Sequence, residues 1–362
     1  MRRINTPLTR LLDITTPVVV PPMAGASGGA LAAQATIGGG FGFIASGYGS
    51  LESLGNEIAL ARSLLDEAQH PRPEPRVLPI GVGFFGWLLE KDHARAKEYI
   101  SFVLDNNLQA IWFSFGRDLG TWVQFVRDYD QRSSKSHRTV IFVLVNTVEE
   151  ASAAISIWKA DVVVAQGKSF LHIKEWAGNE AGGHGLGTAP SLLTLVPAVL
   201  DLSDSEMGCP PILAAGGLAT GAHIASMLTL GTSGAVLGTR FLLSPESQYS
   251  DEQRRCLIDA GPSSTVRTMA FDNARGTLDW PEGIDGRGLR NDTVKDFDAG
   301  MDLKNLQELF QKGIAAKDPS RMLVWAGTGV GIMKSVKPAT HIVQELHTEC
   351  EEKLRRVYNM CE

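Results

Sequence analysis

Cysteine is scarce in this chain of 362 residues, and its four copies lie far apart in the sequence. They are Cys209, Cys256, Cys350 and Cys361. Their spacing matches neither a CxxC metal-binding pair nor the dense disulfide framework of small secreted domains. We therefore expect a reducing, intracellular compartment and no metal site.

Long apolar runs and basic stripes are also missing. Residues 1–16 carry Arg2, Arg3 and Arg10 in place of the apolar core of a signal peptide, and no later run is long enough to cross a bilayer. The formal net charge is −6, and the Lys and Arg residues are scattered rather than clustered as a phosphate backbone requires. These absences predict a cytoplasmic protein whose partners include neither membrane nor nucleic acid.

The amino-acid composition of the chain is that of an ordinary globular protein. Hydrophobic residues make up 44% of the chain and charged residues 20%, which is enough apolar surface for a substantial core. A (β/α)8 barrel takes about 250 residues and tolerates insertions. The length therefore does not decide between one large domain and two smaller ones.

Short apolar runs alternate with stretches of helical spacing along the first two thirds of the chain. The runs that predict strands are 17–22, 41–46, 77–83, 110–115, 139–145, 161–166, 211–215 and 234–239. The stretches that predict helices are 51–68, 91–104, 119–129, 148–159, 191–200 and 221–230. Eight such units favour an α/β fold that closes into a (β/α)8 TIM barrel over residues 1–243, since an open doubly wound sheet more often stops near six strands.

The alternation stops at Ser244, and residues 244–362 have a different character. Helical spacing recurs at 246–260, 302–315 and 338–358, whereas 272–292 is rich in Gly, Asp and Arg and predicts an irregular loop. A Gly-rich segment covers 325–331. We expect a C-terminal extension of helices and loops that caps the barrel without a second core.

Glycines follow the seventh and eighth predicted strands. The seventh ends in Ala215-Gly216-Gly217, and the eighth ends in Gly238-Thr239. Phosphate groups bind at these two strand ends in (β/α)8 barrels. Glycine lets the backbone approach an anion, and the Thr239 hydroxyl could add a hydrogen bond. The pattern predicts a phosphate-bearing ligand.

A histidine flanked by glycines follows the sixth predicted strand. His184 lies in the run NEAGGHG at 179–185. An imidazole at a barrel mouth is suited to take a proton near neutral pH. A histidine in a loop often does no more than cap it, so the position alone leaves both roles open.

Seven motifs, in this order and at these strand ends, resemble the nitronate monooxygenase family, formerly called 2-nitropropane dioxygenases. They are PMAG at 22–25, QG at 166–167, EAGGH at 180–184, AGG at 215–217, GTRF at 238–241, GRGLRN at 286–291 and AGTGVG at 326–331. The resemblance covers almost the whole chain. It implies an FMN-binding (β/α)8 barrel that oxidises alkyl nitronates with molecular oxygen.

The resemblance also implies roles for individual residues. Met23, Ala24 and Gly25 would border the isoalloxazine ring, and Gln166 would hydrogen-bond to it. His184 falls on the histidine that acts as the base toward nitroalkanes. The flavin phosphate would be held by Gly183, Gly216, Gly217, Gly238 and Thr239.

One departure from the family pattern concerns the stretch after the sixth strand. Residues 168–177, KSFLHIKEWA, separate Gly167 from Gly178, whereas the family motifs are nearly continuous there. The insertion is either a lid over the pocket or an error at a splice boundary of the gene. It bears on the role of Gln166 and on the placement of His184.

The expected activity is that of an FMN-dependent oxidoreductase whose partners are a small nitronate or nitroalkane and O2. One alternative is a flavin-dependent NAD(P)H reductase, or an oxidase or dehydrogenase of a specialised metabolite. A second is a flavin-free barrel that binds a phosphorylated metabolite. The sequence leaves open the physiological substrate and the choice between monomer and homo-oligomer. Aromatic residues that form either a substrate wall or ordinary packing are Tyr48, Phe84, Phe85, Trp87, Phe115 and Trp176.

Overall fold

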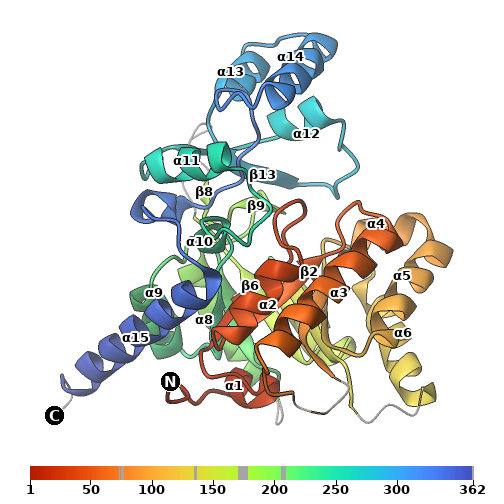
Figure 1. Cartoon of the computed structure of the whole chain (residues 1–362), viewed down its shortest axis with the longest axis vertical. Coiled ribbons are helices and arrows are strands. Elements are labelled where there is room, and N and C mark those ends of the chain that lie inside the picture. Colours follow the sequence, from red (N-terminus) through yellow and green to blue (C-terminus); the bar gives the residue numbers. More distant parts are fainter. Residues whose placement is uncertain (73, 75–76, 134–136, 170–177, 205–208, 361–362) are drawn as a thin grey trace.

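The core of the molecule is a closed barrel of eight parallel strands (Figure 1). The computed structural model describes residues 1–72, 74, 77–133, 137–169, 178–204 and 209–360. Around the barrel the strands follow the order β1 (Val18–Val20), β2 (Phe41–Ala45), β3 (Leu78–Phe85), β4 (Leu108–Ser114), β5 (Val140–Val145), β6 (Val162–Gln166), β10 (Ile212–Ala215) and β11 (Gly234–Val236). The predicted (β/α)8 barrel and all eight predicted strands are confirmed.

Strand alternation decides which side chains face the barrel interior. On β6, Val162 and Val164 pack inside, while Val163 and Ala165 pack outward against the helices. The same parity brings Gln166, at the end of β6, to the interior side. On β3 the outward set ends with Phe84, so Phe85 faces inward.

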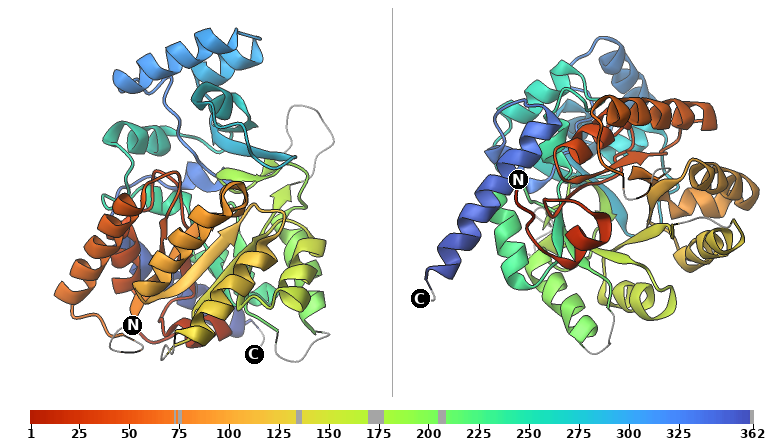
Figure 2. Two further views of the ribbon diagram at one scale, coloured as in Figure 1. Left: turned by 90° about the vertical axis from the view of Figure 1, so that its right-hand side faces the viewer. Right: turned by 60° about the horizontal axis from the view of Figure 1, so that its bottom comes forward.

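Large aromatic side chains fill the barrel interior. Trp112 stacks on Phe142 with ring centroids 5.6 Å apart, and Phe43 meets both rings edge-on. The short helix α1 (Pro7–Leu12) closes the N-terminal end, where Leu8 and Leu12 join the same buried cluster. Figure 2 shows α1 lying across this end. The filled interior leaves only the C-terminal end of the barrel for a ligand site.

Helices surround the barrel and begin where the sequence supplies a capping side chain. Ser50, Thr147 and Thr220 each accept a backbone N–H of the first turn, at α3, α7 and α9. The helices predicted in this part of the chain are confirmed to within a few residues. The surrounding helices are α2 (Gly29–Ile37), α3 (Leu51–Glu67), α4 (Gly86–Lys91), α5 (His93–Asp105), α6 (Leu119–Arg132), α7 (Val148–Ser152) with the π-turn η1 (Ala153–Ile157), α8 (Leu192–Asp204) and α9 (Gly221–Leu230).

A cap stands over the C-terminal end of the barrel (Figures 1 and 2). It contains a three-stranded antiparallel sheet in the order β12, β13, β9. These strands and the helices of the cap are β9 (Gly183–Leu186), α10 (Thr239–Leu242), α11 (Asp251–Asp259), β12 (Thr265–Thr268), α12 (Ala270–Arg275), β13 (Ile284–Leu289), α13 (Asp292–Asp298), α14 (Leu303–Ala315) and the 3-10 turn η2 (Thr328–Ile332). The predicted irregular loop at 272–292 is wrong, because it contains the end of α12 and the whole of β13.

The cap also has a small hydrophobic core, which the sequence analysis did not expect. Phe271 of α12 packs with Leu306 and Phe310 of α14, and all three are almost fully buried. Helices α11 and α14 confirm the helical predictions there, although α11 begins only at Asp251 because Ser250 and Gln253 form a capping box.

The last helix leaves the cap and returns to the barrel. α15 (Ala339–Tyr358) packs on the outside against α2 and α9, where Ile342, Val343 and Leu346 are buried. It confirms the helix predicted at 338–358. The first two residues of the insertion form β7 (Lys168–Ser169), which pairs with β8 (Gly178–Asn179) directly after it.

Candidate active site

A pocket opens at the C-terminal end of the barrel, where the inward-facing strand ends meet the cap. Ser114 of β4, Gln166 of β6 and Ala215 of β10 contribute to its floor. Its roof comes from the cap, through Arg275 and Trp280 among others. The pocket encloses about 1200 Å³, its open mouth included.

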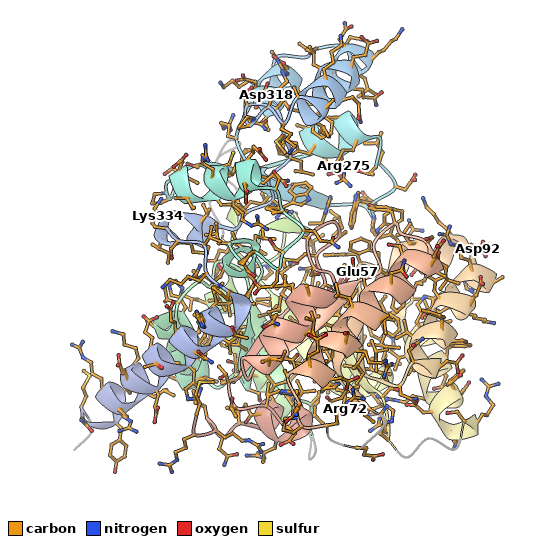
Figure 3. The ribbon with its side chains drawn as sticks, viewed as in Figure 1. Glu57, Arg72, Asp92, Arg275, Asp318 and Lys334 are labelled. Atoms are coloured by element: carbon orange, nitrogen blue, oxygen red, sulfur yellow. The ribbon has the colours of Figure 1, made fainter. Side chains whose placement is uncertain are left out.

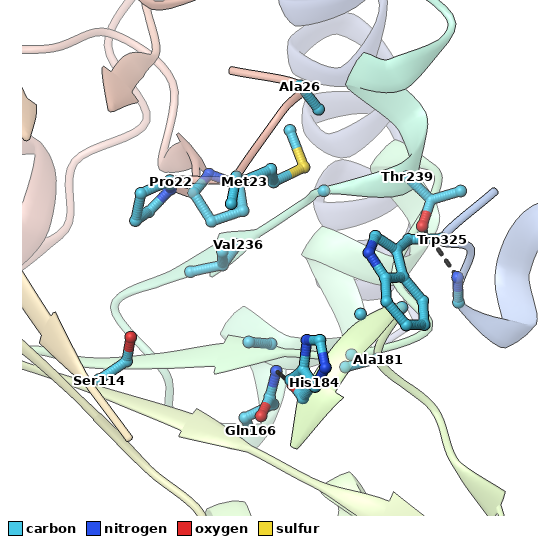
Figure 4. A pocket seen from close by; sticks show the side chains of 18 of the residues that line it. Pro22, Met23, Ala26, Ser114, Gln166, Ala181, His184, Val236, Thr239 and Trp325 are labelled. Atoms are coloured by element: carbon cyan, nitrogen blue, oxygen red, sulfur yellow. Dashed lines mark hydrogen bonds between the residues drawn. The ribbon is translucent and has the colours of Figure 1, made fainter. Parts of the chain in front are cut away.

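Nine of the ten predicted site residues line this pocket, and Figure 4 shows several of them around one space. Gly25 does not line it; this glycine forms a turn at φ +72° directly after the lining residues Met23 and Ala24. The nine are Met23, Ala24, Gln166, Gly183, His184, Gly216, Gly217, Gly238 and Thr239. The fold thus brings together motifs that are distant in the sequence.

The glycines after β10 and β11 border one side of the pocket. Gly216 and Gly217 have φ values of +123° and +68°, which side chains rarely adopt. The Thr239 hydroxyl accepts a hydrogen bond from the Gly327 backbone N–H at 2.9 Å, drawn as a dashed line in Figure 4. Since a hydroxyl both accepts and donates, Thr239 keeps its own proton for a ligand.

Gln166 is held at the pocket floor by hydrogen bonds on both ends of its amide. The Asn146 side chain donates to Gln166 Oε1 at 2.9 Å, and Gln166 Nε2 donates to the His184 carbonyl at 3.3 Å. The residue is only 7% exposed. Although an insertion follows it in the sequence, Gln166 therefore stays tied to the strand that carries His184.

His184 lies on strand β9 rather than on the expected loop. It pairs with Gly286 of β13, and the missing side chain at Gly286 leaves room for the Trp325 ring. Trp280 stacks on the imidazole with ring centroids 3.6 Å apart. The His184 side chain is 9% exposed. Its ring is thus fixed by neighbours from the cap.

A buried carboxylate contacts the imidazole of His184. Both Oδ atoms of Asp272 lie 3.0 Å from Nε2, and the Asp272 side chain is fully buried. Burial lowers the pKa of His184, and Asp272 opposes this effect. His184 is therefore neutral near pH 7 and able to accept a proton.

Aromatic side chains form the wall opposite the glycines. Tyr48, Phe85 and Phe115 line the pocket, and Phe85 meets Trp280 at 5.2 Å. Phe115 has φ +58°, a backbone strain that is unusual for a bulky residue and common at functional sites. Burial raises the pKa of Tyr48 to about 12, so its hydroxyl stays protonated.

Two of the other predicted wall residues, Phe84 and Trp87, do not line the pocket. Phe84 points outward into the helix layer, as its strand parity requires. Trp87 packs behind the wall against Tyr48 and Trp280. Trp176 and most of the insertion, 170–177, lie outside the described residues.

Several residues in or next to the site that belong to the cap were not predicted from the sequence. Asp272, Arg275 and Trp280 fall at the edge of or within the segment predicted as a loop, where no periodicity marked them. Tyr249 binds the Trp325 backbone through its hydroxyl, and burial raises its pKa. A signal was available only for Trp325, which precedes the Gly-rich motif.

The described residues also bear on the binding of metal ions and membranes. In the described part of the chain, no three His, Cys, Asp or Glu side chains are grouped so that they could hold a metal ion. None of the helices described there is both long and apolar enough to cross a membrane.

Comparison with known proteins connects this site with an enzyme family. A nitronate monooxygenase of Neurospora crassa is 32% identical over 94% of this chain and 91% of its own length. The crystal structure of nitroalkane oxidase from Streptomyces ansochromogenes is 26% identical, with a TM-score of 0.74 over 97% of this chain and all of that one. FabK from Thermotoga maritima, at 22% identity, has a TM-score of 0.73 over 99% of both chains and shares the fold.

The sequence profile of nitronate monooxygenases matches most of the chain, over residues 5–70 and 95–349. The matched region contains all ten residues with a predicted catalytic or cofactor-binding role. The family consists of flavin-dependent oxidoreductases. The chain therefore belongs to the nitronate monooxygenase family.

Proposed function

We propose that this enzyme uses FMN and O2 to oxidise alkyl nitronates to a carbonyl compound and nitrite, and that it accepts neutral nitroalkanes after removing a proton. The observation that carries the proposal is His184, a neutral imidazole paired with Asp272 on the wall of the pocket. Named relatives of this chain act on nitronates or nitroalkanes. The physiological substrate belongs to this class.

The residues around the pocket fit FMN. Gly183 has φ +72°, and a Cβ there would stand in open space, so the backbone can approach a ligand. Gly216, Gly217, Gly238 and Thr239 would hold the phosphate together with Gly183. Met23, Ala24 and the turn at Gly25 would border the ring system, and Gln166 would hydrogen-bond to it. Bound FMN supplies an electron acceptor that O2 reoxidises.

The chain itself supplies the base, the orientation and the exclusion of water. His184 takes the α-proton of a neutral nitroalkane, whereas a preformed nitronate needs no such step. The aromatic wall of Tyr48, Phe85 and Phe115 gives the substrate an apolar surface. Arg275 faces the same pocket, and Figure 3 marks it just below α12. A positive charge at this position favours the binding of an anionic nitronate.

We further propose that residues 1–243 and 244–362 work as one unit, since the pocket lies between them. The low cysteine content favours a reducing compartment, the cytoplasm. Partners beyond the small substrate and O2 are not needed for the reaction.

The test is product formation by the purified enzyme without any nicotinamide. With FMN bound, ethyl nitronate and O2 should give acetaldehyde and nitrite in equal amounts. Oxidation of NADPH with no nitrite from any nitroalkane would move the assignment to a reductase. A protein that never retains a flavin would favour a barrel for a phosphorylated metabolite.

A further inference from the structure

We propose that Asp272 is a positioning residue that fixes the imidazole of His184 with its Nδ1 atom as the proton acceptor. The inference rests on the proposed function, because it concerns the base for neutral nitroalkanes. Asp272 lies on α12 of the cap, and His184 lies 88 residues earlier on β9. A residue of the cap would thus determine which nitrogen of His184 accepts the proton.

The surroundings of Asp272 are those of an ionised carboxylate that only accepts hydrogen bonds. Thr277 Oγ1 donates to Oδ1 at 2.8 Å, and Trp280 Nε1 donates to the same atom at 3.2 Å. The imidazole Nε2 is 3.0 Å from each oxygen. A carboxylate without exposure is costly unless such donors satisfy it.

This geometry decides which tautomer the imidazole adopts. Because an ionised carboxylate donates nothing, Nε2 must carry the proton that lies between the two groups. The lone pair is then on Nδ1. Within the described residues, no hydrogen bond to Nδ1 is present, and His184 lines the pocket. Nδ1 is therefore the atom available to a substrate.

The proton transfer follows from this arrangement. Nδ1 takes the α-proton of the nitroalkane, and the electron pair of the broken C–H bond stays on the substrate, which becomes the nitronate. His184 becomes an imidazolium ion while Asp272 remains a carboxylate that stabilises it. Trp280, stacked on the ring and bonded to Asp272, keeps both groups in place.

Charged groups on neighbouring elements act on the same imidazole. Arg275 of α12 and Arg267 of β12 both lower the pKa of His184, in addition to burial. Asp272 raises it and is the acidic group that opposes them. Without the carboxylate the base would be weaker.

The decisive variant is Asp272→Asn, which keeps the shape and removes the charge. Thr277 and Trp280 both donate to Oδ1, so the amide oxygen should stay there and the NH2 group should replace Oδ2. That NH2 would donate to Nε2 and move the ring proton to Nδ1. We expect kcat/KM for nitroethane to fall about 10³–10⁴-fold and that for ethyl nitronate to fall less than tenfold.

The pH profile gives a second measurement. Asp272 raises the pKa of His184. The remaining activity of Asp272→Asn on nitroethane should therefore show its acid limb at a lower pH than the wild type. Asp279→Asn is the matched control, because this carboxylate lies in the loop directly after α12 but pairs with Lys91 at the surface. It should behave as the wild type. If Asp272→Asn lowered kcat/KM equally for nitroethane and ethyl nitronate and left the acid limb at the wild-type pH, the proposal would be overturned.

The tautomer of His184 can be measured directly by 15N NMR of the wild-type enzyme with labelled histidine. The His184 signal is the one that is absent from the spectrum of His184→Asn. A neutral ring protonated on Nε2 is expected, and a proton on Nδ1 would overturn the proposal even if Asp272→Asn fails to fold. Because this reading needs no turnover, it is separate from the proposed function. A wild type that yields no nitrite would contradict the function alone.

Discussion

His184 is the residue on which the proposed proton removal depends. We predict that His184→Asn lowers kcat/KM for nitroethane by about 10²–10⁴-fold, the usual contribution of a general base. Preformed ethyl nitronate already lacks the proton, so its kcat/KM should change less than tenfold. Nitrite release with each substrate measures both values. Equal losses on the two substrates would rule out the role as base.

The protonation state of His184 predicts how activity depends on pH. Burial lowers its pKa below the ordinary value of about 6.5. The base is active when neutral, so activity is present above the folded-state pKa and lost as the pH falls through it. For nitroethane, the acid limb of kcat/KM should therefore be centred below pH 6.5. An acid limb centred above pH 6.5 would contradict the buried environment.

Arg275 provides the positive charge at the pocket. No ion pair with Arg275 occurs among the residues that the structure describes. We predict that Arg275→Gln raises KM for ethyl nitronate roughly three- to tenfold, the scale of a partly exposed charge pair of about 1 kcal/mol. KM for neutral nitroethane should hardly change. Arg290→Gln, at the surface of the cap, is the control, and an equal effect on both substrates would show that Arg275 acts otherwise.

At the scale of elements, the turn after β10 is proposed to hold the cofactor phosphate. Gly217→Asp would place a carboxylate against the phosphate, so we predict that the purified variant has lost most of its FMN. Gly300→Asp is the matched control, since Gly300 also has a positive φ but lies on the cap away from the pocket. Flavin absorbance relative to protein measures the difference. Full FMN content in Gly217→Asp would show that the phosphate lies elsewhere.

The barrel strands could be predicted from the sequence because their signal is local. Each strand is a short apolar run, and its inward parity also explains why Gln166 reaches the pocket. The cap sheet could not be predicted from the sequence, because β9 and β13 are far apart in the chain. Both are rich in glycine, and neither shows an alternation of apolar and polar residues. Asp272 was missed for the same reason. Its function depends on a contact across that sheet and not on its neighbours in the chain.

For the whole molecule, the main feature is that the cap and the barrel both contribute residues to one pocket. Gln166 reaches the pocket from a barrel strand, whereas Trp280 and Trp325 belong to the cap. Trp280 stacks on His184 and Arg275 faces the pocket, whereas most of the residues proposed to hold FMN lie closer to the barrel strands. Changes at Arg275 or Trp280 should therefore alter activity on the substrates without altering flavin binding.

The proposed function requires this protein to pass electrons from a nitronate to FMN. It is tested most directly by the visible spectrum of the purified protein, recorded before and after anaerobic addition of ethyl nitronate and then of NADPH. We predict flavin absorption bands that bleach with the nitronate before NADPH is added. Bands that bleach only with NADPH, or no flavin bands even after reconstitution with FMN, would contradict the account.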